Sequence, residues 1–203
     1  MAETVLHARE DGGSAMRMTR AGVSEAGTGM KAKYYKSWHL AEDESSFKVT
    51  EFEWTMIRFY EAFSRCVTTM GALTIDADLK YSEHLILHVI RMQDRPKSSA
   101  TIARMINRDD IPNIQYSLRK LEAKGLIEKV QENGSKTFAY AVTDKGAQTT
   151  DEYAALRNEV LLGPMATIGN FDTSIAKVTQ LLGVMTGIYE EAARNSATFS
   201  KED

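Results

Sequence analysis

Cysteine, proline and long apolar runs are scarce in this chain of 203 residues. Its one cysteine, Cys66, can form no disulfide within the chain, so no disulfide framework supports the fold. No run of about 18 apolar residues occurs, so we expect no membrane-spanning helix. The N-terminus lacks the apolar stretch of a secretory signal, and together these absences predict a cytoplasmic protein.

The signature motifs of common enzyme classes are also missing. The chain contains no glycine-rich phosphate loop ending in Lys-Ser or Lys-Thr, no G-x-S-x-G and no H-E-x-x-H. Residues 134–137, GSKT, are similar to the end of a phosphate loop, but the upstream glycine is absent and two expected strands flank them. We therefore expect neither an enzyme nor a bound cofactor.

Charge is unevenly distributed along a chain that can still bury a core. Hydrophobic residues make up 43% of the sequence, which argues against global disorder. The formal net charge is −3, yet residues 80–145 contain 12 Lys and Arg against 8 Asp and Glu. A local basic surplus can steer a protein toward nucleic acid, although uneven surface charge alone is weak evidence.

The part of the chain before residue 80 divides into an arm and a helical extension. Residues 1–30 contain five glycines and no apolar period, so we expect a flexible N-terminal arm. Residues 31–79 follow as an N-terminal extension with a dimerisation helix, which Thr50 and Glu53 would start as a capping box. The apolar stripe of this helix consists of Phe52, Met56, Phe59, Phe63, Val67 and Met70.

Residues 80–146 have the pattern of a winged helix-turn-helix lobe. A helix with Ser82 as its expected N-cap is followed by a short helix over SSATIARMIN and by a third helix within residues 108–127. Two alternating segments then flank Asn133-Gly134, which is a strong hairpin signal. The expected fold class is mainly α (α+β): a winged helix-turn-helix core with a two-stranded β wing and long N- and C-terminal dimerisation helices.

The helix within residues 108–127 is apolar on one face and polar on the other. Ile114, Leu118 and Leu121 form the apolar stripe. In a winged helix this element enters the DNA major groove, where Asn and Gln can bond adenine and Arg can bond guanine. The residues that we expect to read bases or bind phosphates are Ser98, Ser99, Asn113, Gln115, Tyr116, Arg119, Lys120, Ser135 and Lys136. The alternative is a winged-helix protein-interaction module whose polar face is merely solvated.

Residues 147–203 are expected to form C-terminal dimerisation helices. Gly163-Pro164 should interrupt or end the first of them, and Asp172 can cap the second. An apolar stripe follows that cap, formed by Ile175, Val178, Leu182, Met185 and Tyr189. Helices this long and apolar need a surface to bury against, and a second copy of the chain would supply one.

Two segments resemble the MarR family of bacterial transcription regulators, over about residues 50–195. They are IPNIQYSLRKLEAKGLIEKV at 111–130 and NGSKTFAYAVTDKG at 133–146, in which VTDKG matches the family pattern after the wing. The resemblance implies an obligate dimer that binds a pseudo-palindromic operator, usually as a repressor. The family wing usually carries an Asp and, two residues later, an Arg that enters the minor groove. Here Lys136 follows Gly134 and Ser135, so the contribution of the wing to sequence preference is weaker.

The resemblance also implies a pocket for a small aromatic acid between the dimer helices and the winged-helix lobe, and hence a possible role in aromatic catabolism. An arginine can pair with a carboxylate and a tryptophan can stack on a ring. The expected ligand-binding residues are Trp54, Arg58, His84, His88 and Arg91. The plainer interpretation is that Arg58 pairs with Glu61 or Glu51 and that both histidines only pack.

Two further chemistries compete with the aromatic acid. His84 and His88 have the spacing of a helical zinc pair, but no third ligand is evident, although Glu83 and His39 are conceivable; we therefore expect no metal. Cys66 could sense oxidants, as some family members do, although a buried cysteine is usually inert. Substitution of Cys66 by serine separates the redox hypothesis from the ligand hypothesis.

Overall fold

The computed structural model describes residues 38–131 and 138–199. The chain divides into two units, the residues up to Phe59 and those from Tyr60 on, and helix α2 (Glu44–Thr74) runs through the boundary. The later elements are α3 (Tyr81–Arg91), η1 (Met92–Asp94), α4 (Ser99–Met105), α5 (Ile111–Ala123), β1 (Ile127–Gln131), β2 (Phe138–Val142), α6 (Asp144–Arg157), the π-helical turn η2 (Asn158–Leu162), α7 (Gly163–Met165) and α8 (Phe171–Ser196). Within the described ranges, no helix is long and apolar enough to cross a bilayer.

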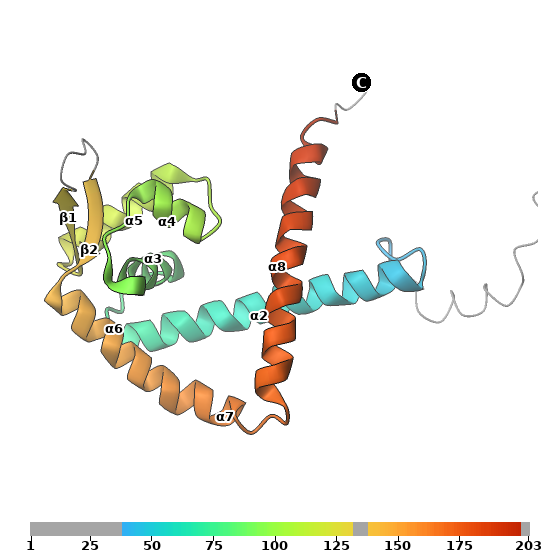
Figure 1. Cartoon of the computed structure of the whole chain (residues 1–203), viewed down its shortest axis with the longest axis horizontal. Coiled ribbons are helices and arrows are strands. Elements are labelled where there is room, and N and C mark those ends of the chain that lie inside the picture. Colours follow the sequence, from blue (N-terminus) through green and yellow to red (C-terminus); the bar gives the residue numbers. More distant parts are fainter. Residues whose placement is uncertain (1–37, 132–137, 200–203) are drawn as a thin grey trace, which may run out of the picture. The chain divides into compact units, whose positions relative to one another are not determined.

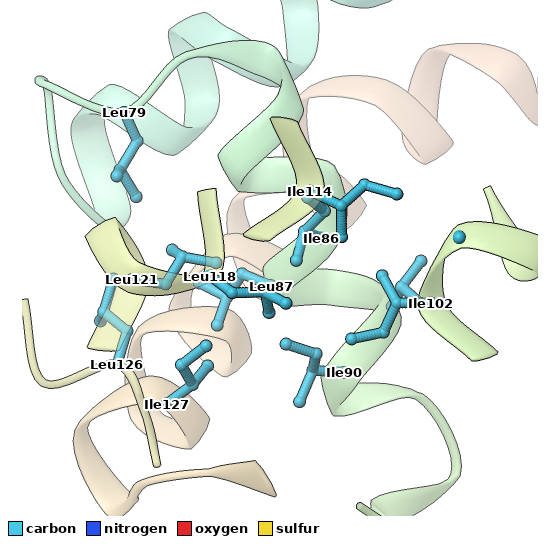
Figure 2. Close-up of a cluster of buried hydrophobic side chains, with 12 residues drawn as sticks. Leu79, Ile86, Leu87, Ile90, Ile102, Ile114, Leu118, Leu121, Leu126 and Ile127 are labelled. Atoms are coloured by element: carbon cyan, nitrogen blue, oxygen red, sulfur yellow. The ribbon is translucent and has the colours of Figure 1, made fainter. Parts of the chain in front are cut away.

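Helices α3, α4 and α5 lie together with the β1–β2 hairpin around one apolar core (Figure 1). The stripe expected on α5 is confirmed, because Ile114, Leu118 and Leu121 are all fully buried. Figure 2 shows these side chains meeting Ile86, Leu87 and Ile90 of α3, Ile102 of α4, and Leu126 and Ile127 at the start of the hairpin. Each such side chain stabilises the fold by roughly 1.5–3 kcal/mol through burial. The expected mainly α fold with a winged helix core and a two-stranded wing is therefore confirmed.

The antiparallel wing is anchored to the segment before α4. Ile127 pairs with Val142 at one end of the hairpin, and Gln131 pairs with Phe138 at the other. The backbones of Lys97 and Tyr140 form a further bridge. Tyr140 N donates to Lys97 O at 2.9 Å, and Lys97 N donates to Tyr140 O at 3.0 Å. The wing therefore begins in a fixed position relative to the helix-turn-helix.

Lys97 is a buried lysine that sequence analysis did not single out. Its Nζ donates to the backbone oxygens of Ile90 and Arg95, each at 3.0 Å, and to that of Met92. These carbonyls lie where α3 ends and where Gln93 has a φ of 63°. Burial lowers the pKa of Lys97. The ammonium group thus satisfies carbonyls at the end of α3 in place of water.

Three expected N-caps were wrong. Helix α2 starts at Glu44, so Thr50 lies inside it, and Asp43 instead accepts from the backbone N of Ser46 at 2.7 Å. Ser82 also lies inside its helix, and Asp172 lies in the first turn of α8, which follows Asn170. At each helix another residue starts the first turn, because a cap signal is short and recurs near a helix start by chance.

The VTDKG sequence at 142–146 joins the wing to α6. Thr143 caps α6, since its Oγ1 accepts from the backbone N of Gly146 at 3.1 Å and donates to the Gly125 oxygen at 2.7 Å. Gly146 lies so close to the wing that a Cβ atom there would be 2.0 Å from the backbone oxygen of Leu126. Only glycine permits this approach of α6 to the start of β1.

The regular part of α6 ends at Arg157, before the expected break. The π-helical turn η2 follows, and Gly163-Pro164 then form the first turn of the short helix α7. Proline is tolerated there because the first helical N–H groups have no partner within the helix. The expected interruption near Gly163-Pro164 is thus a change of helical pitch that precedes the pair.

Candidate nucleic-acid interface

Helix α5 is capped at its start and carries an exposed polar face. Asp110 caps the helix, accepting from the backbone N of Asn113 at 3.3 Å, and Pro112 lies in the first turn. Gln115, Tyr116 and Arg119 are exposed, Tyr116 by 59%. None of these three side chains makes a hydrogen bond or ion pair with the part of the chain that the structure describes. Their donors and acceptors are free to meet an external partner.

The side chains of Asn113 and Lys120, unlike those of their neighbours on this helix, have hydrogen-bond partners within the fold. The Asn113 amide donates to the carboxylate of Asp110, which holds it at the helix start. Lys120 Nζ donates to the backbone oxygen of Asp78 at 2.6 Å and lies 3.7 Å from Glu83 Oε2. The ammonium group of Lys120 is therefore directed toward the start of α3, and a phosphate would have to compete with these two partners.

Glu83 is a buried carboxylate that ties α3 to α5. Its Oε1 accepts from Ser117 Oγ at 3.1 Å, and its Oε2 accepts from the backbone N of Lys80 at 2.7 Å. Both Glu83 and Ser117 are almost fully buried. In the sequence, Glu83 is indicated only as a conceivable zinc ligand. The signal for its actual role is its position three residues after Lys80, the residue before the helix. Here it sets how α5 is rotated against α3.

The remaining expected DNA contacts lie at α4 and at the wing. Ser98 caps α4, with Oγ 3.2 Å from the backbone N of Thr101, and Ser99 is the half-buried first residue of that helix. Ser135 and Lys136 lie outside the described residues. On the wing, Lys129 Nζ donates to Glu122 at 2.8 Å, which raises the pKa of Lys129, and the nearby Arg119 acts against this rise. Arg119 precedes Glu122 by three residues, so it shares the flank of α5 from which Glu122 reaches Lys129 of β1.

His88 and Arg91 lie on the face of α3 that meets α6. The rings of His88 and Tyr153 are 4.3 Å apart between centroids, and burial lowers the pKa of His88 to about 4. Arg91 pairs with Asp94 and, at 3.4 Å, with Asp151 on α6. Both residues thus have partners within the fold, and their role in ligand binding stays a prediction.

His84 is fully buried against the end of α2. A Cβ atom on Gly71 would lie 2.3 Å from Cε1 of the His84 ring, so the ring packs directly on the glycine backbone. Among residues 38–131 and 138–199, no group has the distance and angle of a hydrogen bond to either ring nitrogen. Burial lowers the pKa of His84, and the nearby Glu83 and the backbone of Leu79 act against this shift. Within the same ranges, no three His, Cys, Asp or Glu side chains are grouped as a metal site would require.

Trp54 and Arg58 belong to the unit that ends at Phe59. Trp54 is exposed and lines a cleft of about 370 Å³ with Trp38, His39, Leu40 and Thr50. Arg58 donates to Thr55 Oγ1 at 3.2 Å, while Glu61 pairs with Arg65 at 3.8 Å. Cys66 is a free, half-buried thiol on α2. The common ligand site for Trp54, Arg58 and the α3 residues remains a prediction.

The lobe that contains α5 is similar to a known protein family. Residues 79–146 match the family model described as winged helix DNA-binding domain. This lobe is therefore similar to winged helix DNA-binding domains. The expected resemblance of this domain and its flanking helices to MarR regulators is confirmed in the fold by solved structures.

Three of these structures illustrate the likeness. The transcriptional regulator BldR from Sulfolobus solfataricus is 20% identical, with a TM-score of 0.55, and the match covers 70% of this chain and 98% of that one. A MarR family transcriptional regulator from Rhodococcus sp. RHA1 is 16% identical, with a TM-score of 0.56 and coverage of 71% and 97%. Streptococcus pneumoniae FabT, solved in complex with DNA, is 14% identical, with a TM-score of 0.54 and coverage of 71% and 99%. No curated protein matches the sequence.

Proposed function

We propose that this protein is a DNA-binding transcription regulator that reads an operator through the winged helix domain. The observation that carries the proposal is the row of Gln115, Tyr116 and Arg119 on α5, exposed and without partners in the part of the chain that the structure describes. Amide and guanidinium groups at such positions discriminate bases in the major groove. The fold shared with FabT, which was solved with DNA, supports the same conclusion.

The protein acts as a homodimer on a pseudo-palindromic operator. None of the residues of α8 is buried, although Ile175, Val178, Leu181, Val184 and Ile188 are apolar and at least 45% exposed. An exposed apolar surface of this length needs a cover, and a second copy offers the same surface in return. Two lobes would then meet two half-sites of the DNA.

If α8 forms the dimer interface, negative charge introduced on its apolar surface should separate the two copies. The Leu181→Glu and Ile188→Glu double variant should run as a single chain of 22.7 kDa, because two buried carboxylates per copy oppose association. Light scattering after size exclusion measures the mass. Lys177→Glu, an exposed polar position on the same helix, is the control and should stay dimeric. A monomeric wild type would contradict the proposal.

We further propose repression that a small aromatic acid releases. This step is supported by the MarR resemblance, and the candidate contacts are Trp54, Arg58, His84, His88 and Arg91. The test is a gel shift of the full chain on its upstream intergenic DNA, with and without benzoates and hydroxycinnamates. A tight shift released by one compound supports both steps. If no compound releases the shift, the aromatic-acid hypothesis is wrong. If folded protein gives no shift at low salt, the DNA-binding hypothesis is wrong and the protein-interaction alternative is favoured.

Arg119→Ala is expected to weaken binding to the operator by roughly 1–3 kcal/mol, as the loss of a bidentate base contact would. Fluorescence anisotropy on operator and on random DNA of equal length measures both affinities. Arg194→Ala is the matched control, since Arg194 pairs with Glu191 on α8 at 2.6 Å, away from the helix-turn-helix in sequence. An equal loss on random DNA would assign Arg119 to phosphate binding.

A further inference from the structure

A cleft of about 420 Å³ lies between the start of α3 and the first turns of α5. Its floor contains the buried Ile86 and Ile114, and its rim carries charged and polar groups from both helices and from the turn before α5. The charged groups of the lining are Lys80, Arg108, Lys120, Glu83 and Asp110. Neither the winged helix motif nor the expected DNA contacts assign this cleft a role.

Both acids that line the cleft are already bonded. Glu83 accepts from Ser117 and from the backbone of Lys80, and it lies 3.7 Å from Lys120. Asp110 accepts from the backbone N and the side-chain amide of Asn113 as the cap of α5. Glu83 is therefore paired with a cation, Lys120, whereas the oxygens of Asp110 are occupied by neutral donors at the start of α5.

Two cations of the lining remain without an acid. Lys80 and Arg108 are exposed, and neither side chain makes an ion pair or a hydrogen bond with the described ranges 38–131 and 138–199. Asp109 and Glu190 line a neighbouring cleft with Arg108, but neither forms an ion pair with it, and Glu190 accepts from Asn107 Nδ2 at 2.8 Å. The cleft thus offers an ammonium and a guanidinium that form no ion pair within these ranges, and its cations outnumber its acids. The two groups together suit one phosphate group.

The cleft borders the DNA-reading helix on one flank. Asn113 and Tyr116 line it, whereas Arg119 does not. Arg119 lies three residues before Glu122, on the flank of α5 that meets Lys129 of β1. When a helix lies in the major groove, the phosphates of the two strands run along its two sides. The wing can reach one strand, and the Lys80–Arg108 side can reach the other.

We propose that Lys80 and Arg108 form a seat for a backbone phosphate of the operator, on the flank of α5 away from the wing. The seat rests on the proposed DNA-binding function and adds to it the contact that fixes the depth and register of α5 in the groove. It neutralises one phosphate in each protomer and carries no base preference of its own.

The test measures affinity of the full chain for operator and random DNA from 0.05 to 0.5 M salt. The Lys80→Ala and Arg108→Ala double variant should lose affinity on both DNAs alike, by roughly tenfold per protomer at 0.1 M salt, and its salt slope should be shallower by about one per protomer. Lys177→Ala with Arg194→Ala on α8 is the control pair and should keep the wild-type slope. Equal thermal midpoints of wild type and double variant show that folding is unaffected.

Each other outcome counts against the seat. An unchanged salt slope in the double variant, with wild-type binding intact, overturns the seat and leaves the regulator function standing. If the slope is unchanged but millimolar inorganic phosphate raises the thermal midpoint of the wild type and not of the variant, the cleft takes a free phosphate and not a DNA strand. A folded wild type that binds no DNA at all overturns the proposed function and the seat together.

Discussion

Replacing Gly146 with alanine is expected to destabilise the winged helix domain by roughly 3 kcal/mol or more, the upper range for overpacking a close contact. The added Cβ would lie 2.0 Å from the Leu126 backbone oxygen, and both partners are main chain. Neither can turn aside as a side chain would. Either β1 or α6 must move, and Thr143 would then lose its bonds to Gly146 and Gly125. The free energy of unfolding of a typical domain is only about 5–15 kcal/mol in total, so this loss is large.

Urea unfolding followed by circular dichroism measures the change in the free energy of unfolding. Gly183→Ala is the matched control, because the residue lies inside helix α8 and a Cβ atom there meets nothing within 4 Å. It should be neutral or slightly stabilising, since alanine favours a helix by about 1 kcal/mol over glycine. A Gly146→Ala variant as stable as the Gly183→Ala control would refute the close approach of α6 to the wing.

Gly146 also shows which features could be predicted from the sequence and which could not. The VTDKG pattern supported the family resemblance, but nothing in the sequence says what lies against its glycine. The stripe of Ile114, Leu118 and Leu121 could be predicted because helical spacing alone places those side chains on one face. The hairpin followed in the same way from alternation around Asn133-Gly134. These two features, which depend on local periodicity, were therefore confirmed.

Features that depend on distant partners were not predictable. Lys120 belongs to the polar face of α5 by spacing, yet Asp78 and Glu83, some forty residues earlier, turn its ammonium group toward α3. Lys97 looks like any surface lysine in the sequence, and its burial follows from how α3 ends. The candidate site is thus best predicted where a side chain has no partner, as at Gln115, Tyr116 and Arg119, because its helix alone determines its direction.

Acid is expected to destabilise the fold through His88 by about 2 kcal/mol between pH 7.5 and pH 5. The pKa of His88 falls from 6.5 to about 4, mainly because the ring is buried, and the nearby His84 and Arg157 lower it further. The unfolded chain therefore takes up a proton below about pH 6.5 that the folded chain refuses until about pH 4. Stability is complete above pH 6.5 and is lost progressively as the pH falls toward 4, to a limit of about 3 kcal/mol.

Urea unfolding at pH 7.5, 6 and 5 measures this loss for wild type and for His88→Phe, which keeps a ring against Tyr153. The variant should lose about 2 kcal/mol less than the wild type over the same range, because it has no imidazole to protonate. His39→Phe, at an exposed position, should keep the wild-type dependence and serves as the control. If His88→Phe is as acid-sensitive as the wild type, the acid response comes from other groups. His84, fully buried against Gly71 with its pKa also lowered, would be the next residue to replace.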